Sequence, residues 1–177
     1  RPTYKRYLQF MISTPLRASE AARLRWDQVD EDRSELHFTH HDTKNSEHFV
    51  MPLSQIAAKV IWAKPQEQDL LVFPLSSLDG AHMSAWSHYN RCVRKASGID
   101  NFILHDLRRT FSTLMAEHTD ASESIIDSLL NHKQSATRGG VMRHYQQAKN
   151  LEKRRDVMAQ WGKLLRAWGM TLPTANE

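Results

Sequence analysis

Six side chains in this sequence belong to types that bind anions, move protons or act as nucleophiles. They are Arg17, Lys44, His105, Arg108, His132 and Tyr145. His105 and Arg108 stand three residues apart, so in a helix they would share one face. A face with one imidazole and one permanent guanidinium suits an oxyanion that must be held while a proton moves. The stretch from 102 to 145 therefore indicates a site for an anionic substrate.

Each of these side chains also has a plain structural interpretation. His105 alone is more often a core or capping histidine, and Tyr145 alone a half-buried aromatic. Lys44 would simply be solvated at a loop tip, and Arg17 would be a surface arginine beside Glu20. The functional interpretation depends on the whole set occurring in one order along the chain.

Composition bounds the class of protein. With 177 residues, 40% of them hydrophobic, the chain can fill a real core. No run of 18 apolar residues and no signal-peptide pattern occurs, so neither a membrane span nor secretion is expected. The single cysteine, Cys92, excludes an intramolecular disulfide framework and fits a reducing compartment. A net charge of +4 and a pI near 9.3 favour a polyanionic partner.

The elements that must position these residues are mostly helical. Apolar residues alternate with polar ones over 36–38 and again over 49–53, which predicts a β-hairpin with Lys44 near its tip. Ser54 is expected to cap one helix, Gly98 to close another that starts near Ser84, and Asp120 to cap a third. The predicted fold is mainly α with a small β-hairpin or sheet, an α+β class.

The C-terminal part has the clearest helical period. Apolar residues fall at i, i+4, i+7, i+8 and i+11, namely Val157, Trp161, Leu164, Leu165 and Trp168. A helix is expected over about 151–169, followed by a frayed tail over 170–177. The stripe can pack on the chain's own core or on a neighbouring protomer, and the sequence favours neither.

The order and local context of these residues resemble the catalytic domain of the tyrosine recombinases, the phage-integrase family, and especially integrases of prophages and genomic islands. The resemblance covers essentially the whole chain. It rests on Leu16-Arg17-Ala18-Ser19-Glu20 with Leu24 and Trp26, Lys44, Val50-Met51-Pro52-Leu53-Ser54, His105-Asp106-Leu107-Arg108-Arg109-Thr110, Leu129-Leu130-Asn131-His132, Tyr145 with Ala148, and Leu151-Glu152-Lys153-Arg154-Arg155 before Trp161.

The resemblance implies site-specific cleavage and rejoining of DNA for integration or excision of a mobile element. Tyr145 would attack the scissile phosphodiester and form a 3′-phosphotyrosine, leaving a free 5′ hydroxyl. Arg17 and Arg108 would clamp the nonbridging oxygens, since a guanidinium donates bidentately and keeps its charge. The link conserves the phosphodiester energy, so no ATP, metal or other cofactor is expected.

The remaining catalytic roles implied by the resemblance concern protons. Lys44 would protonate the leaving 5′ oxygen, His105 would assist proton transfer at the tyrosine, and His132 would donate a hydrogen bond to the phosphate. Phosphate contacts that position DNA are expected from flanking basic residues. These are Arg109, Lys133, Arg138, Arg143 and Lys149, which otherwise form a solvated basic face.

The same resemblance implies partners and setting. The expected partners are double-stranded DNA attachment sites, with a homotetramer on DNA and a monomer for the isolated domain. The expected location is the cytoplasm of a bacterium or phage-infected host, at the nucleoid. Residues 1–177 would form one catalytic domain cut from the C-terminal part of a longer integrase, without the family's N-terminal domain.

Two positions depart from the family pattern. Pro15 stands where a glycine is common before the first arginine, and Asn131 replaces a glycine before the second histidine. Asparagine tolerates the left-handed conformation better than most residues, so the second change is mild. A Gly139-Gly140 pair leaves open an undocked Tyr145 in the absence of DNA.

Three other functions compete. A type IB topoisomerase shares the phosphotyrosine chemistry, but the short chain and integrase-like tail argue against it. A catalytically inactive DNA-binding module is disfavoured by the complete residue set. A metal-dependent nuclease would need a ligand pattern, and neither HExxH nor paired cysteines accompany His40-His41, so no metal site is expected.

Overall fold

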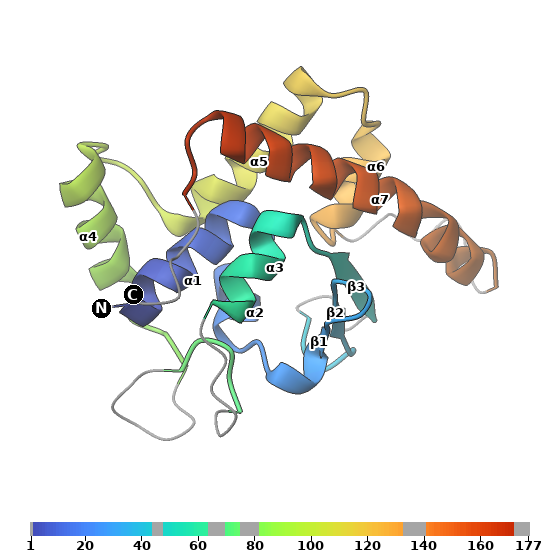
Figure 1. Cartoon of the computed structure of the whole chain (residues 1–177), viewed down its shortest axis with the longest axis horizontal. Helices are drawn as coiled ribbons and strands as arrows, with labels where there is room; N and C mark the ends of the chain where they lie inside the picture. Colours follow the sequence, from blue (N-terminus) through green and yellow to red (C-terminus); the bar gives the residue numbers. More distant parts are fainter. Residues whose placement is uncertain (1, 44–47, 64–69, 75–81, 133–140, 172–177) are drawn as a thin grey trace.

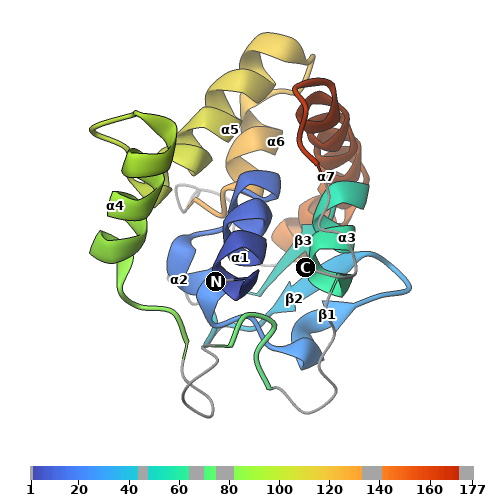
Figure 2. The ribbon, with the colours of Figure 1, turned by 60° about the vertical axis from the view of Figure 1, so that its left-hand side comes forward.

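The computed structural model describes residues 2–43, 48–63, 70–74, 82–132 and 141–171, with the side chains of residues 2 and 141–149 outside the description. Helix α1 (Pro2–Ser13) crosses the middle of the molecule and contacts α2 (Ala18–Ala22) and α3 (Gln55–Trp62). Helix α4 (Trp86–Ser97) lies on one side of α1, and α3 with the sheet lies on the other (Figures 1 and 2).

The sheet has three antiparallel strands in the order β1-β2-β3. The predicted hairpin is confirmed as β2 (Glu35–Phe38) and β3 (Phe49–Pro52), with Leu36 opposite Met51 and Phe38 opposite Phe49. These four apolar side chains are buried. Strand β1 (Val29–Asp30), which follows the 3₁₀ turn η1 (Trp26–Gln28), was not predicted because two residues in a polar, turn-rich segment carry no alternation.

Local capping signals locate most helix ends. The Ser54 hydroxyl accepts a hydrogen bond from the Ala57 amide and so begins α3, and Gly98 ends α4 in the left-handed conformation at φ +73°. Helix α5 spans Leu104–His118 and α6 spans Glu123–Leu129. The expected cap at Asp120 is wrong, because the residue preceding α6 is Ser122.

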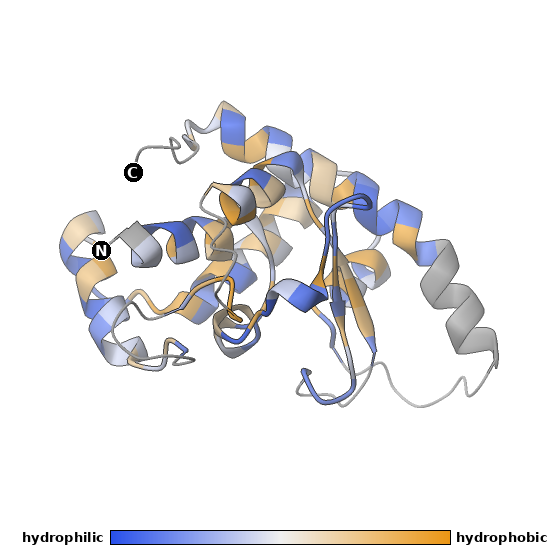
Figure 3. Ribbon diagram, turned by 60° about the horizontal axis from the view of Figure 1, so that its bottom comes forward, coloured by the Kyte–Doolittle hydropathy of each residue, from blue (hydrophilic) through white to orange (hydrophobic). Residues whose placement is uncertain are grey.

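Helix α7 (Val141–Ala167) runs along the body and contacts α1, α3, α5, α6 and β3. Hydrophobic and hydrophilic residues alternate along it in Figure 3. Val157, Trp161 and Leu165 of the expected stripe are buried, and the Trp161 ring meets Phe111 edge-on at 5.2 Å. The stripe therefore packs on the chain's own core, with Trp168 left 51% exposed.

The helix also begins earlier than the expected start near 151. Residues 143–150 are largely polar and carry no apolar stripe, so periodicity alone did not indicate them. As a result Tyr145 and the buried Trp161 belong to one helix, and whatever holds the later turns of α7 also orients the turns that carry the tyrosine.

Candidate active site

Arg108 is a buried cation on the second turn of α5, with 4% of its surface exposed. Its Nη1 donates to the Pro15 carbonyl at 2.5 Å, and its Nη2 donates to the Leu130 carbonyl. These bonds join α5 to the segment before α2 and to the end of α6. A charge removed from water needs such partners, so the guanidinium is fixed in place by backbone oxygens.

Arg17 approaches the same place from the start of α2. Its Nη2 donates to the Asn131 carbonyl at 3.2 Å. Asn131 directly follows Leu130, whose carbonyl accepts from Arg108. Its Nη1 donates to Glu20 Oε1 at 2.8 Å, while its backbone amide donates to Glu20 Oε2 at 3.0 Å. The buried Glu20 carboxylate therefore holds both the side chain and the backbone of Arg17.

The two guanidiniums meet at the backbone of residues 130 and 131. Asn131 has φ +46°, so the chain turns through the left-handed region there, as its tolerance for that region predicts. Burial lowers the pKa of Arg108 to about 10, the Arg17 charge acts in the same direction, and Glu20 opposes it. Arg108 remains charged at neutral pH, so this point concentrates positive charge.

Two histidines lie beside this pair. His132 directly follows Asn131 and is exposed, and its Nδ1 lies 3.2 Å from Asp127 Oδ1. His105 is exposed on the first turn of α5, three residues before Arg108. The structure thus places His105 and His132 on the elements that carry or contact Arg108, with both imidazoles open to solvent.

The other site residues from the sequence are described less fully. Lys44, Lys133 and Arg138 lie outside the described residues. Tyr145, Arg143 and Lys149 lie in α7, but their side chains are outside the description. Arg109 is exposed on α5 and forms an ion pair with Asp106 at 3.7 Å.

Sequence reasoning missed three contributions at this site. Glu20 was considered only as a surface partner of Arg17, although its spacing of three residues was the available signal. Asp127 binds His132, and no motif marks it. Pro15 departs from the family pattern, yet the group that Arg108 uses is its backbone carbonyl, which any residue supplies.

Helix α4 adds a basic surface that sequence reasoning also passed over. Its sequence contains no aspartate or glutamate, and His88, Arg91 and Lys95 are exposed on it. Tyr89 of α4 stacks on Tyr4 of α1 with ring centroids 4.3 Å apart, which anchors the helix to the body. The lack of acidic residues over 86–97 was the signal that could have identified this surface.

Neither a metal cluster nor a membrane span occurs in the described part of the chain. No group of three or more histidine, cysteine, aspartate or glutamate side chains there could hold a metal ion. None of the described helices is both long enough and apolar enough to cross a membrane.

Comparison with known proteins now gives the family. The sequence model of the Phage integrase family matches residues 2–150. The prophage integrases IntF and IntA of Escherichia coli (strain K12) are 28% identical over 173 residues and 27% identical over 160 residues. These alignments cover 94% and 89% of this chain but 34% and 38% of the relatives, so the chain spans about a third of their length.

The fold has a solved counterpart. The integrase from mycobacterium phage Brujita superposes with a TM-score of 0.68 at 19% identity, over 91% of this chain and 52% of that one. This likeness confirms the mainly helical fold with a small antiparallel sheet. The match of the family model over residues 2–150 gives the conclusion: the chain belongs to the phage integrase family.

Proposed function

We propose that this chain is the catalytic part of a site-specific recombinase that cleaves and rejoins DNA through a 3′-phosphotyrosine at Tyr145. The observation that carries the proposal is the meeting of Arg17 and Arg108 at the backbone of residues 130–131. Family membership implies DNA recombination, and this arrangement supplies the charge that a phosphodiester transition state needs.

The two arginines would act on the nonbridging oxygens. Arg108 has five N–H donors, of which carbonyls take one each from Nη1 and Nη2, so further donors remain for phosphate oxygens. Because negative charge on those oxygens grows toward the pentacoordinate state, fixed guanidiniums stabilise that state more than the bound substrate. Losing one such contact typically costs about 10²–10³ in rate.

The remaining groups would accept the proton that Tyr145 loses and supply the proton that the leaving 5′ oxygen gains. The Tyr145 oxygen attacks phosphorus and its proton passes to His105, while the bond from phosphorus to the 5′ oxygen breaks. Lys44 gives a proton to that oxygen, and His132 donates a hydrogen bond to the phosphate. Rejoining reverses each step with a 5′ hydroxyl of the same or a partner strand, so the number of phosphodiester bonds is unchanged.

DNA would lie along the basic surfaces around this point. Helix α4 presents Arg91 and Lys95, and α5 presents Arg109. Contacts from such residues to phosphates position the duplex without reading its sequence. Arg143, Lys149, Lys133 and Arg138 are proposed to add to them, and a tetramer on paired attachment sites would carry out strand exchange.

A covalent-capture experiment tests the proposal. The protein is incubated at low salt with duplexes of randomised sequence that carry a nick, so that the short fragment released by cleavage diffuses away. Denaturing recovery of protein-linked DNA should yield adducts with the wild type and none with Tyr145→Phe. Adducts should form equally in EDTA. Adduct formation by Tyr145→Phe, or an absolute need for a divalent ion, would contradict phosphotyrosine chemistry.

Exchange is tested with the captured sequence. A second duplex with a free 5′ hydroxyl is added to the adduct, and the joined strand is measured. Joining to the new partner supports recombination. Adducts that only rejoin their own strand would instead indicate a topoisomerase-like activity.

A further inference from the structure

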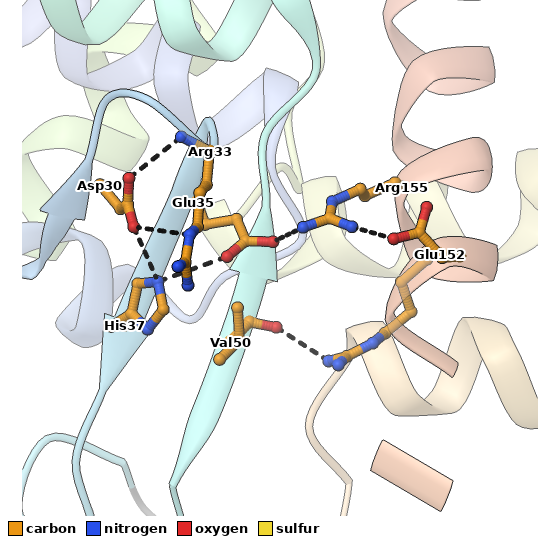
Figure 4. A network of polar contacts seen from close by, with 8 residues as sticks. Asp30, Arg33, Glu35, His37, Val50, Glu152 and Arg155 are labelled. Atoms are coloured by element: carbon orange, nitrogen blue, oxygen red, sulfur yellow. Dashed lines mark hydrogen bonds and ion pairs between the residues drawn. The ribbon is translucent and has the colours of Figure 1, made fainter. Parts of the chain in front are cut away.

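Two adjacent arginines fasten α7 to the sheet. Arg154 Nη1 donates to the Val50 carbonyl of β3 at 2.8 Å, and its guanidinium carbon lies 5.8 Å from the centre of the Phe49 ring. Arg155 Nη2 donates to Glu35 Oε1 of β2, an ion pair that Figure 4 shows reaching from the helix to the strand. Glu35, Val50, Arg154 and Arg155 are called the sheet latch below.

Glu35 and Arg154 of the latch are buried and Arg155 is half-buried, with 35% of its side chain exposed, so the Glu35–Arg155 ion pair is not a fully solvated surface pair. Glu35 is 1% exposed and Arg154 is 6% exposed. Burial lowers the pKa of Arg154 to about 10, while Glu35 opposes the shift and Arg155 adds to it. A buried carboxylate that loses its cation is strongly destabilising. Arg155 is the guanidinium that meets Glu35 Oε1, and His37 Nε2 of the same strand lies 3.4 Å from Oε2.

The latch contacts both strands of one hairpin. Glu35 belongs to β2 and Val50 to β3, and the strands pair from Glu35 opposite Pro52 to Phe38 opposite Phe49. Residues 39–48, among which Lys44 stands in the sequence, connect these two strands. The orientation of the hairpin relative to α7 is therefore set at these few contacts.

The same helix carries the proposed nucleophile. Tyr145 precedes Arg155 by ten residues on α7, which is about 15 Å along a helix axis. In the proposed reaction the attacking and leaving oxygens stand on opposite sides of phosphorus, so the tyrosine and the lysine must be held at one fixed spacing. The latch joins α7, which contains Tyr145, to the two strands that flank the segment with Lys44 in the sequence.

We propose that Arg154, Arg155 and Glu35 are positioning residues that fix the Lys44 hairpin against the Tyr145 helix, a role that rests on the proposed function. Misplacing a reacting group by about 1 Å can cost about a hundredfold in rate. Loosening the latch should therefore slow cleavage by impairing protonation of the leaving oxygen, while the arginine pair at the phosphate is unchanged.

The test uses two captured substrates that differ only at the leaving atom. One has the natural 5′ oxygen, and the other has sulfur in its place, which leaves as a thiolate without protonation because a thiol has a pKa of only about 8.5. Glu35→Gln should slow cleavage of the oxygen substrate by about a hundredfold and of the sulfur substrate by about tenfold or less. Arg155→Lys, which keeps a cation opposite Glu35, should slow cleavage of the oxygen substrate less than Glu35→Gln does.

Glu152→Gln is the matched control. Glu152 also binds Arg155, but it lies on α7 and is exposed, so it does not join the helix to the sheet. Its removal should leave both substrates near wild-type rates. Equal slowing of both substrates by Glu35→Gln, or slowing by Glu152→Gln as large as that by Glu35→Gln, would overturn the proposal.

A distance measurement separates this inference from the proposed function. Nitroxide labels are placed at His48→Cys near β3 and Gln160→Cys on α7, both exposed positions, in a Cys92→Ser background. Glu35→Gln should broaden the distance distribution between the labels. If wild type formed no adduct, the proposed function would fail, while this measurement would still decide the latch. An unchanged distribution would reject it.

Discussion

Two pairs of arginines in this protein each contain one buried and one half-buried member, and they differ in a way that separates ligand binding from structural support. Arg17 and Arg108 come from different elements and meet at backbone carbonyls. Arg154 and Arg155 are neighbours on α7 and bind the sheet. In each pair the more deeply buried member has its pKa lowered to about 10, with burial as the largest cause. Desolvation alone therefore does not distinguish the pairs.

The carboxylates distinguish them. In the described part of the chain, the first pair has ion-pair contact with Glu20 alone, whereas the second has contact with Glu35 and Glu152. The second pair thus belongs to a network in which carboxylates match its charge, and Glu35 extends that network to His37 on its own strand. Two cations with one anion leave a net positive charge at a fixed point, which is the property an anionic substrate requires. Carboxylate partners, more than burial, indicate which arginines are available to a ligand.

The largest expected effect follows from breaking the charge-rich pair. Arg108→Lys keeps a cation but loses the planar fork that binds two carbonyls, so the charge would no longer be held at the phosphate. We expect single-turnover adduct formation to fall by about 10²–10³. The sulfur-leaving substrate should give no recovery, because its nonbridging oxygens are unchanged. Recovery with sulfur would mean that Arg108 acts on the leaving group instead.

The next effect concerns the single carboxylate at that pair. Glu20→Gln should keep a hydrogen bond to Arg17 but remove the charge that fixes its side chain and backbone amide. We expect cleavage to fall by about tenfold, equivalent to about 1.4 kcal/mol. Glu20→Asp, which retains charge on a shorter side chain, is the control and should lose less. Equal loss in both variants would indicate that geometry, rather than charge, is what Glu20 supplies.

Close packing also positions helix α7, independently of the arginine and carboxylate contacts. A Cβ on Gly162 would lie 2.9 Å from the Ser54 Cβ at the start of α3. Gly162→Ala should cost about 1–3 kcal/mol from overpacking, offset by about 1 kcal/mol of helix propensity. We expect a net loss of about 1 kcal/mol in the free energy of unfolding, measured by denaturant titration.

The matched control is a variant that removes the Ser54 Cβ. Ser54→Gly deletes the Cβ at the cost of a few tenths of a kcal/mol of capping, because glycine is itself an acceptable cap. The double variant should therefore be more stable than Gly162→Ala alone. Additive losses would show that the contact between these two residues does not limit how closely α7 approaches α3.

Local signals explain how much of this structure could be predicted. The β2–β3 hairpin, the Ser54 cap, the Gly98 terminus and the buried stripe on α7 each depend on residues close together in sequence. The left-handed Asn131 could likewise be anticipated from its side chain. Family motifs selected the arginine pair, but its carbonyl partners belong to the backbone and have no sequence signature.

Contacts between distant segments could not be predicted in the same way. Glu35, the first residue of β2, carries no local signal of burial, yet it is buried and its ion-pair partner Arg155 comes from 120 residues further along the chain. Strand β1 forms because β2 offers an open edge, and its own sequence gives no sign of it. The start of α7 at Val141 was missed because residues 143–150 are largely polar and follow a segment rich in Ser, Thr and Gly.

The smallest expected effect concerns arginines and lysines on the surface, where the presence or absence of a carboxylate partner should again decide which cations bind DNA. Among the described residues, Arg91 and Lys95 on α4 have no carboxylate partner, whereas Arg25 contacts Asp27 and Asp42, each at 3.0 Å. Each cation that neutralises a DNA phosphate contributes about −0.9 to the slope of log K against log salt. Arg91→Ala or Lys95→Ala should therefore make the slope shallower by about one, while Arg25→Ala leaves it unchanged.

Binding titrations of the captured duplex across a salt series measure these slopes. A shallower slope for Arg25→Ala than for Arg91→Ala would contradict the criterion, since an arginine committed to two carboxylates would then be neutralising phosphate. Such a result would also weaken the distinction between the two arginine pairs, because that distinction depends on the same criterion of carboxylate partners. A guanidinium that already binds carboxylates must break those ion pairs before it can bind a DNA phosphate, which costs free energy. Arg91 and Lys95 of α4 have no such ion pairs to break among the described residues.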